Sequence, residues 1–298
     1  MRVFLTGASG FVGSAVVQEL IGAGHQVVGL ARSDSSAEQL LAAGIEVHRG
    51  ALDDLESLKS GAAAADGVIH TAFIHDFKDY EAACKTDTLA VQTIAEALAG
   101  SDRPFVITSG IAMLKPGTVG TENDMPDPNS AASHRIASEK AILAMAAKGV
   151  RSSVVRLPPS VHGDGDHGFV PALINIARQK GVAAYVGEGL NRWPAVHRLD
   201  AARLFRLALE KGAAGSIFHG VADEGVPMRD IVEVISRHLN VPVVSKTAQE
   251  AAEHFGWLAY FVGVDCPASS LQTQTQLGWT PVQTALLPDI DLGTYFNS

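Results

Sequence analysis

Short apolar runs rich in β-branched residues alternate with longer amphipathic stretches through the first half of the chain. The apolar runs predict strands over residues 3–5, 26–30, 45–48, 67–71, 105–108 and 153–157. The stretches between them predict helices over residues 12–21, 36–43, 80–98 and 131–147, with a shorter one starting over 54–59. Such alternation is typical of a parallel sheet covered by helices on both faces, whose strands are apolar throughout because both their faces are buried. We therefore predict an α/β fold with a doubly wound parallel sheet.

The pattern is less regular after residue 157. Prolines and glycines predict a long loop over residues 158–168. Helical patterns return over residues 169–179, 200–209, 228–239 and 248–254, with a short strand near 216–219. No Ser/Gly-rich linker separates the two halves. We expect a core of residues 1–157, to which residues 193–220 return, and a smaller C-terminal substrate lobe formed by residues 158–192 and 221–298.

The composition argues against several classes of protein. The chain has 298 residues and a net charge of −9, whereas a nucleic-acid surface needs a basic stripe. No window reaches the roughly 20 apolar residues of a membrane span, and the N-terminus lacks the pattern of a signal peptide. Only Cys84 and Cys266 are present, so a disulfide framework is not indicated. We expect a cytoplasmic protein that binds a small molecule and neither nucleic acid nor a membrane.

The sequence TGASGFVG lies between the first predicted strand and the first predicted helix. Its glycines suit separate tasks: Gly7 permits a tight turn, Gly10 lets the backbone approach a diphosphate, and Gly13 lets helix and strand pack closely. The start of a helix also offers free N–H groups and a positive dipole end to phosphates. The spacing alone also fits an ordinary turn, but its place favours a Rossmann-type dinucleotide site. The residues expected to contact the dinucleotide here are Gly7, Ser9, Gly10, Phe11, Val12 and Gly13.

The end of the second predicted strand distinguishes the two nicotinamide dinucleotides. An NAD site places a carboxylate there to bind the ribose 2′-hydroxyl, whereas this chain has Ala31 followed by Arg32 and Ser33. A cation and a hydroxyl suit a 2′-phosphate instead, although Arg32 is also compatible with a solvated loop. We therefore predict NADP, reduced as NADPH, as the cofactor, with NAD the less favoured alternative.

Further motifs follow the glycine motif along the chain. They are His-Thr-Ala after the fourth strand, Thr-Ser on the fifth, Arg-Leu-Pro-Pro-Ser-Val-His-Gly, Val-His-Arg-Leu-Asp and Leu-Gly-Trp-Thr-Pro, at residues 70–72, 108–109, 156–163, 196–200 and 277–281. With these motifs in this order, the chain resembles the extended short-chain dehydrogenase/reductases, relatives of the NAD(P)-dependent epimerases and dehydratases. The resemblance, together with the ends of the predicted strands, implies further cofactor contacts from Leu52, Thr71, Ala72, Phe73, Thr108, Arg135 and Pro158.

The chain departs from this family at the catalytic residues. The family uses a Tyr-x-x-x-Lys pair on a helix, and none of the four tyrosines here has a lysine four residues later. Counting back from the next strand puts the lysine place at His134 or Arg135, or in another register at Lys140, and no register supplies a tyrosine. The family's serine on strand five falls at Gly110, just after Ser109. The chain therefore looks like an atypical member to which the standard mechanism cannot be transferred.

Two histidines are candidates to replace the tyrosine. His75 and Asp76 follow the fourth strand, where Asp76 could orient a ring that titrates near neutral pH; the alternative is a solvated turn. His162 stands where the resembled family has a tyrosine beside its substrate, and Ser109 could still donate a hydrogen bond. His70 should point away from the cofactor by strand alternation, as a hydrogen-bonded core residue.

The remaining polar and aromatic positions near these elements suggest how a substrate is bound. An aromatic wall from the second lobe would suit a flat, apolar substrate, although such aromatics are more often simple core. Neither a metal site at residues 70–76 nor a calcium loop at 162–169 is favoured, because the first lacks convergent side chains and the second lacks further acids. The residues expected to contact substrate are Asp76, Met113, His134, Ser160, His167 and Trp193.

The leading functional hypothesis is an NADPH-dependent oxidoreductase that reduces a small, apolar or aromatic carbonyl compound with a non-standard proton donor. One alternative is an epimerase or dehydratase whose cofactor is reduced and reoxidised within one cycle. Another is a non-catalytic redox sensor that binds NADP without turnover. The resemblance also implies a possible homodimer through the helices at residues 80–98 and 131–147.

Overall fold

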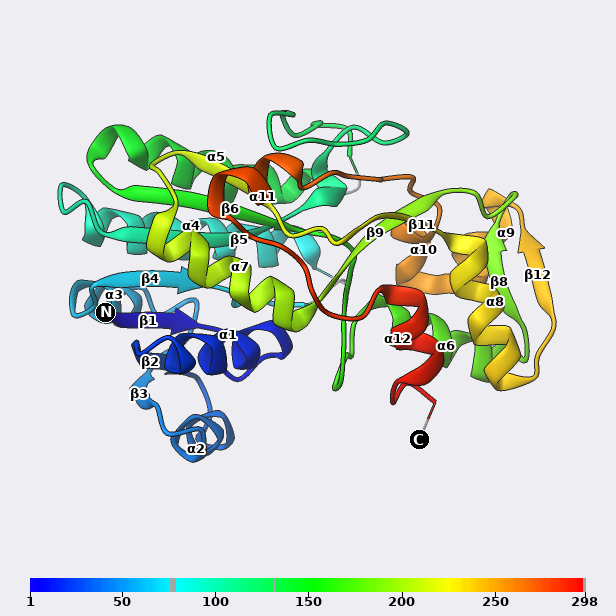
Figure 1. Ribbon diagram of the computed structural model, residues 1–298, viewed down its shortest axis with the longest axis horizontal. Helices are drawn as coiled ribbons and strands as arrows, with labels where there is room; N and C mark the ends of the chain where they lie inside the picture. Colours follow the sequence, from blue (N-terminus) through cyan, green and yellow to red (C-terminus); the bar gives the residue numbers. More distant parts are fainter. Residues whose placement is uncertain (76–78, 131, 297–298) are drawn as a thin grey trace.

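The computed structural model describes residues 1–75, 79–130 and 132–296, and it contains a central parallel sheet with a second lobe at one end (Figure 1). The sheet has seven strands in the order β10-β6-β5-β4-β1-β2-β3, each parallel to its neighbours. Their bounds are β1 Arg2–Thr6, β2 Gln26–Ala31, β3 Glu46–Arg49, β4 Gly67–His70, β5 Pro104–Gly110, β6 Arg151–Leu157 and β10 Ser216–His219. This confirms the predicted α/β fold with a doubly wound sheet.

Helices cover both faces of the sheet because successive strand residues point to opposite sides. Val3 and Leu5 of β1 join the apolar cluster under one group of helices, and Phe4 between them joins the cluster under the other. The first group is α1 Phe11–Gly22, α2 Asp34–Ala42 and α7 Arg198–Lys211. The second group is α3 Leu55–Ala63, α4 Tyr80–Leu98 and α5 Ile136–Ala144.

The helix α5 is shorter than the sequence predicts. The described part of the predicted 131–147 helix begins with a 3-10 turn at Ser133–Arg135, continues as Ile136–Ala144 and ends in a second 3-10 turn at Met145–Lys148. Gly149 closes this segment with a φ of +73°, a left-handed conformation that ends helices. Ser133 opens the first 3-10 turn.

The second lobe lies at the end of the sheet to which the strand arrows point (Figure 1). It contains a three-stranded sheet of β11 Asp223–Pro227, β9 Arg192–His197 and β7 Ser160–His162, and the pair β12 Val243–Lys246 with β8 Ala183–Val186. Its helices are α6 Phe169–Lys180, α8 Met228–Leu239, α9 Ala248–Phe255, α10 Ala259–Val262 and α12 Leu286–Leu292, while α11 Leu271–Leu277 packs on α7 and β10 of the core.

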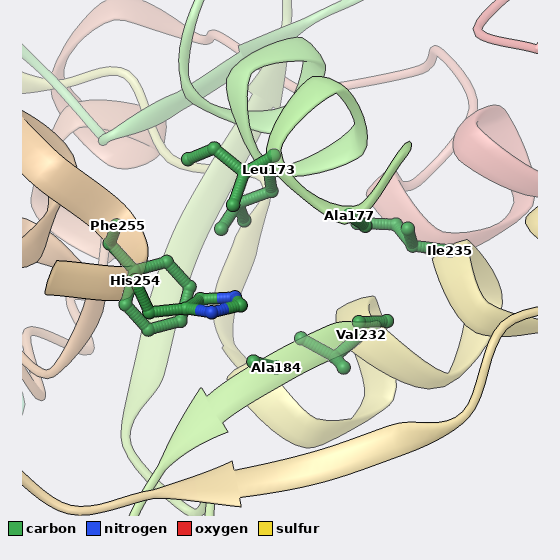
Figure 2. A pocket seen from close by; sticks show the side chains of 9 residues that line it. Leu173, Ala177, Ala184, Val232, Ile235, His254 and Phe255 are labelled. Carbon is green, nitrogen blue, oxygen red and sulfur yellow. The ribbon is translucent and has the colours of Figure 1, made fainter. Parts of the chain in front are cut away.

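The second lobe has an apolar core of its own. Trp193 is fully buried there, and α6, α8, β8 and α9 pack around a void of about 10 Å³ (Figure 2). A void of that size has room for about one water molecule. Within the described residues, no helix has both the length and the apolarity needed to cross a membrane.

Candidate functional site

The glycine turn joins β1 to α1 at the carboxyl edge of the sheet. Gly7 has a φ of +74°, which favours glycine. A Cβ on Gly7 would lie 2.6 Å from the backbone N of Ala72, and one on Gly13 would lie 1.9 Å from the carbonyl O of Gly7. Among the described residues, no side chain caps α1 at its N-cap Gly10, so the first N–H groups of α1 are open to an anion. The turn therefore fits the diphosphate of a dinucleotide.

Parallel pairing brings the ends of the central strands together. Thr6 is the register partner of His70, and His70 is the partner of Ile107. The residues that follow these strands therefore lie side by side, at the edge where open α/β sheets bind ligands. The predicted cofactor residues at this edge are Gly7, Ser9, Gly10, Phe11, Val12, Gly13, Thr71, Ala72, Phe73, Thr108 and, after β6, the buried Pro158.

The end of β2 carries the residues predicted to bind a 2′-phosphate. Arg32 is exposed, and Ser33 caps α2 through a hydrogen bond to the backbone N–H of Ser36. The neighbouring strand β3 adds Arg49, which is the register partner of Ala31. The guanidinium of Arg49 pairs with Asp34 on α2. The sequence does not indicate a role for Arg49, because only the pairing register of β2 with β3 places Arg49 beside α2. Leu52 is half-buried after β3.

Among the three residues considered for the lysine place, Arg135 is the one that faces the ends of the strands. Its Nη2 donates to the carbonyl O of Thr108 at 2.8 Å, and its guanidinium lies 4.1 Å from the ring centroid of Phe73. His134 and Lys140 are both exposed. Arg135, in the 3-10 turn before α5, is therefore the candidate for the lysine place that lies at the ends of the strands.

A buried carboxylate lies below Arg135. Asp87 on α4 is 2% exposed, and its Oδ2 lies 3.9 Å from Nη2 of Arg135. Asp87 also accepts from Ser138 at 2.5 Å and lies 3.1 Å from Nε2 of His70. The prediction that His70 is a hydrogen-bonded core residue is confirmed. Sequence reasoning missed Asp87, because an acid within an amphipathic helix gives no signal of burial.

His75 lies after β4, next to Phe73, at what we call the mouth of the site, formed by Phe73, His75 and Tyr80. Asp76, its predicted partner, lies outside the described residues. The His75 ring is edge-on to Phe73, with the centroids 5.3 Å apart. Its pKa is lowered, first because surrounding protein desolvates the charged form and then because Arg135 and His167 repel it. At neutral pH His75 is therefore an uncharged ring.

Tyr80 adds a tyrosine to the site from α4 instead of α5. Its ring centroid lies 5.9 Å from that of Phe73 and 6.0 Å from that of His134. Burial raises the pKa of its hydroxyl above the ordinary value, so the group keeps its proton at neutral pH. The Tyr-x-x-x-Lys search missed Tyr80 because that search depends on spacing along one helix.

Several predicted site residues are buried away from this mouth. His162 is completely buried, and its Nδ1 lies 2.7 Å from Oδ2 of Asp289. Trp193 belongs to the core of the second lobe. These placements argue against substrate contact by His162 and Trp193, because a completely buried side chain offers no surface to a ligand. Three further candidates are also buried, namely Met113, Ser160 and Ser109, whose Oγ lies 3.8 Å from Sδ of Met113.

The loop at residues 163–168 lies over the start of α1. Exposed His167 is edge-on to Phe11, with the centroids 5.7 Å apart, and the guanidinium of Arg198 lies 5.1 Å from the same ring. Tyr295 anchors the loop from the C-terminal segment by donating to Asp166 at 2.9 Å, beside a hollow of about 230 Å³. The loop thus brings His167 to the dinucleotide end of the site.

A metal centre finds no support in the described residues, where no group of three His, Cys, Asp or Glu side chains is placed to hold an ion. Among the described residues, the polar side chains at the strand ends include Arg135, His75 and Tyr80.

Comparisons with known proteins agree with this geometry. Residues 3–219 match the model of the NAD dependent epimerase/dehydratase family. The chain is 52% identical over 298 residues to "Uncharacterized protein C2A9.02" of Schizosaccharomyces pombe, covering 99% of this chain and 100% of that protein. It is 26% identical over 286 residues to the 4-hydroxy-2-methyl-3-oxo-4-farnesyl-3,4-dihydroquinoline-1-oxide ketoreductase of Stigmatella aurantiaca. The match covers 91% of this chain and 85% of that protein.

A solved structure shows the same fold. The dTDP-glucose 4,6-dehydratase DesIV from Streptomyces venezuelae, with NAD and TYD bound, superposes with a TM-score of 0.80 at 19% identity. The superposition covers 99% of this chain and 96% of that one.

Proposed function

Because the chain belongs to the NAD dependent epimerase/dehydratase family, we propose that it is an NADPH-dependent reductase of small, apolar or aromatic carbonyl compounds. The observation that carries the proposal is the glycine turn, whose backbone leaves no space for a Cβ on Gly13 and whose helix start is uncapped by side chains of the described residues. A diphosphate is the ligand that such a turn suits.

The choice of NADPH rests on the end of β2. The turn and the start of α1 would bind the diphosphate, and Arg32 with neighbouring Arg49 would bind the 2′-phosphate. Arg135 would face the nicotinamide end, where it lies against Phe73. When bound, NADPH supplies a hydride, while the protein supplies binding and orientation.

The substrate oxygen needs a proton, and two side chains at the mouth suit this task. His75 has a lowered pKa, so as a donor it would give a rate that falls as pH rises through a value below its ordinary 6.5. Tyr80 keeps its proton to high pH, so as a donor it would give a flat profile across neutral pH. We propose the protonated form of His75, which is the minor form at neutral pH, as the donor, because the His75 side chain is exposed and Tyr80 is half-buried.

An apolar substrate is supported by the second lobe and by one relative. Phe169 lies at centroid distances of 5.6 Å from Trp257 and 5.1 Å from Phe261, and Trp257 is 43% exposed. Partly exposed aromatics of this kind suit a flat, apolar ligand. The relative from Stigmatella aurantiaca is named as a ketoreductase of a farnesylated quinoline oxide, which is an apolar carbonyl compound.

The proposal is tested by fluorescence titration with NADPH and NADH, followed by turnover with a panel of aromatic and aliphatic ketones. Arg32→Ala should weaken NADPH binding by about 10- to 100-fold, the cost of one hydrogen-bonded charged contact, and leave NADH binding unchanged. Arg178→Ala, a change on α6 in the second lobe, is the control and should alter neither affinity. Equal affinity of the unmodified protein for both dinucleotides would contradict the choice of NADPH.

The turnover assay distinguishes the reductase from the redox sensor and from the epimerase or dehydratase. NADPH binding without oxidation by any ketone would favour the redox sensor. A dinucleotide that stays bound through purification, and is not consumed, would favour the epimerase or dehydratase.

A further inference from the structure

We propose that Arg135 is the fixed cation at the nicotinamide end of the site and that buried Asp87, supported by His70, is the residue that positions it. The inference rests on the proposed function for its ligand, NADPH, and goes beyond it by assigning Asp87 and His70 the role of positioning Arg135.

Arg135 is held in one orientation by three contacts. One N–H of its guanidinium donates to the carbonyl O of Thr108 at 2.8 Å. Its Cζ lies over the Phe73 ring, 4.1 Å from the centroid, and Nη2 lies 3.9 Å from Oδ2 of Asp87. A guanidinium has five donors, so donors remain for the hydroxyls of a ribose. A lysine could form neither the stacking contact nor the fork of donors.

Asp87 is placed where a lone carboxylate would be unfavourable. It is 2% exposed, and an unpaired buried charge is costly. Arg135, His70 and Ser138 together lower the pKa of Asp87 despite its burial, so the carboxylate stays ionised. Ser138 is itself fixed by Thr88, 3.0 Å away on the same helix as Asp87. The network therefore supplies a permanent negative charge beside Arg135.

His70 links this charge to the glycine turn. Its Nδ1 lies 2.8 Å from Oγ1 of Thr6, and the N–H of Ala72 donates to the same Oγ1 at 3.3 Å. Nε2 of the same ring lies 3.1 Å from Oδ1 of Asp87. Two hydrogen bonds and the Asp87–Arg135 ion pair thus connect Arg135 to Thr6, the residue just before the turn.

The experiment compares a whole cofactor with its adenosine half. NADPH and adenosine 2′,5′-bisphosphate are titrated against the unmodified protein, Arg135→Ala, Arg135→Lys and Asp87→Asn. We expect Arg135→Ala to weaken NADPH binding by about 10- to 100-fold and to leave the bisphosphate affinity unchanged. Asp87→Asn should also weaken NADPH binding, by a smaller factor. Arg135→Lys should bind NADPH more tightly than Arg135→Ala but more weakly than the unmodified protein.

Two further variants keep the inference testable. Ser138→Ala removes one hydrogen bond to Asp87 and should weaken NADPH binding a few-fold even if Asp87→Asn does not fold. Glu96→Gln, an exposed change on the same helix as Asp87, should have no effect. Loss of affinity for both probes in equal measure would show a general structural role and overturn the inference. Unchanged NADPH affinity in Arg135→Ala would also overturn it. An unmodified protein that binds neither probe would instead overturn the proposed function, and the inference with it.

Discussion

Gly13→Ala tests the central geometric premise, the contact between the glycine turn and α1. A Cβ at this position would lie 1.9 Å from the carbonyl O and 2.7 Å from the carbonyl C of Gly7, and 3.0 Å from Oγ1 of Thr71. The two nearest atoms belong to the backbone, which cannot rotate away as a side chain can. Helix α1 and the turn must therefore separate by about 1–1.5 Å, the difference from an ordinary van der Waals contact of roughly 3–3.5 Å.

The expected magnitude follows from that displacement. Overpacking of this kind destabilises a protein by about 1–3 kcal/mol, and a displacement of about 1 Å in positioning groups costs on the order of 100-fold. We therefore expect NADPH affinity to fall by about 100-fold, equivalent to about 2.7 kcal/mol. Gly22→Ala is the matched control within the same helix, because nothing lies within 4 Å of its added Cβ. It should stabilise the protein by about 0.5–1 kcal/mol.

The assay pairs fluorescence titration of NADPH with thermal unfolding of both variants and of the unmodified protein. Gly13→Ala must remain folded by circular dichroism for its affinity to be informative. A folded Gly13→Ala variant that binds NADPH within threefold of the unmodified protein would refute the reasoning, because the close approach of α1 to the turn would then be irrelevant to binding.

Three predictions concern stability and assembly. Burial lowers the pKa of His219 from 6.5 to about 4, so its stabilising contribution is complete above pH 6.5 and is lost as pH falls through 4. That loss is about 3 kcal/mol in urea unfolding and should be absent in His219→Gln. Glu139→Gln leaves the completely buried Arg156 without its ion-pair partner and should cost about 3–5 kcal/mol in the same assay, whereas a change at an exposed acid should cost little. We also propose a homodimer through α4 and α5; Leu89, 52% exposed on α4, should then be buried in it, so Leu89→Lys should reduce the molar mass measured by light scattering, and an unmodified protein that is already monomeric would contradict the proposal.

Much of the fold is predictable from the sequence, because the inner strands β1 and β4 are buried along almost their whole length and are therefore largely apolar runs, whereas the edge strand β3 is partly exposed. Helix α4 occupies the predicted range Tyr80–Leu98, since its amphipathic period is regular and Asp79 caps its start. The start of α5 was predicted less well. Alanines give residues 131–147 high helix propensity, but the chain forms a 3-10 turn up to Arg135, whose side chain is held by Thr108 and Phe73. Tertiary contacts, not propensity, determine that boundary.

The residues of the candidate site differ in the same way: some can be predicted from their sequence neighbours, and others depend on partners far away in the chain. The glycine turn is local, since Gly7, Gly10 and Gly13 lie on one short segment and their spacing carries the information. The placement of His162 could not be predicted in this way, because its partner Asp289 comes from α12 at the other end of the chain. A histidine beside glycines gives the same sequence signal whether it faces a ligand or a buried carboxylate.

Arg135 and Asp87 form an ion pair at the carboxyl ends of the central strands. Considered alone, Arg135 is a departure from a lysine motif, and Asp87 is one acid in an amphipathic helix. In the fold each explains the other: the carboxylate is almost completely buried and requires a cation, and the cation is oriented by the carboxylate, a carbonyl and an aromatic ring. Removing the tyrosine and lysine of the family motif therefore does not leave this end of the sheet without charge.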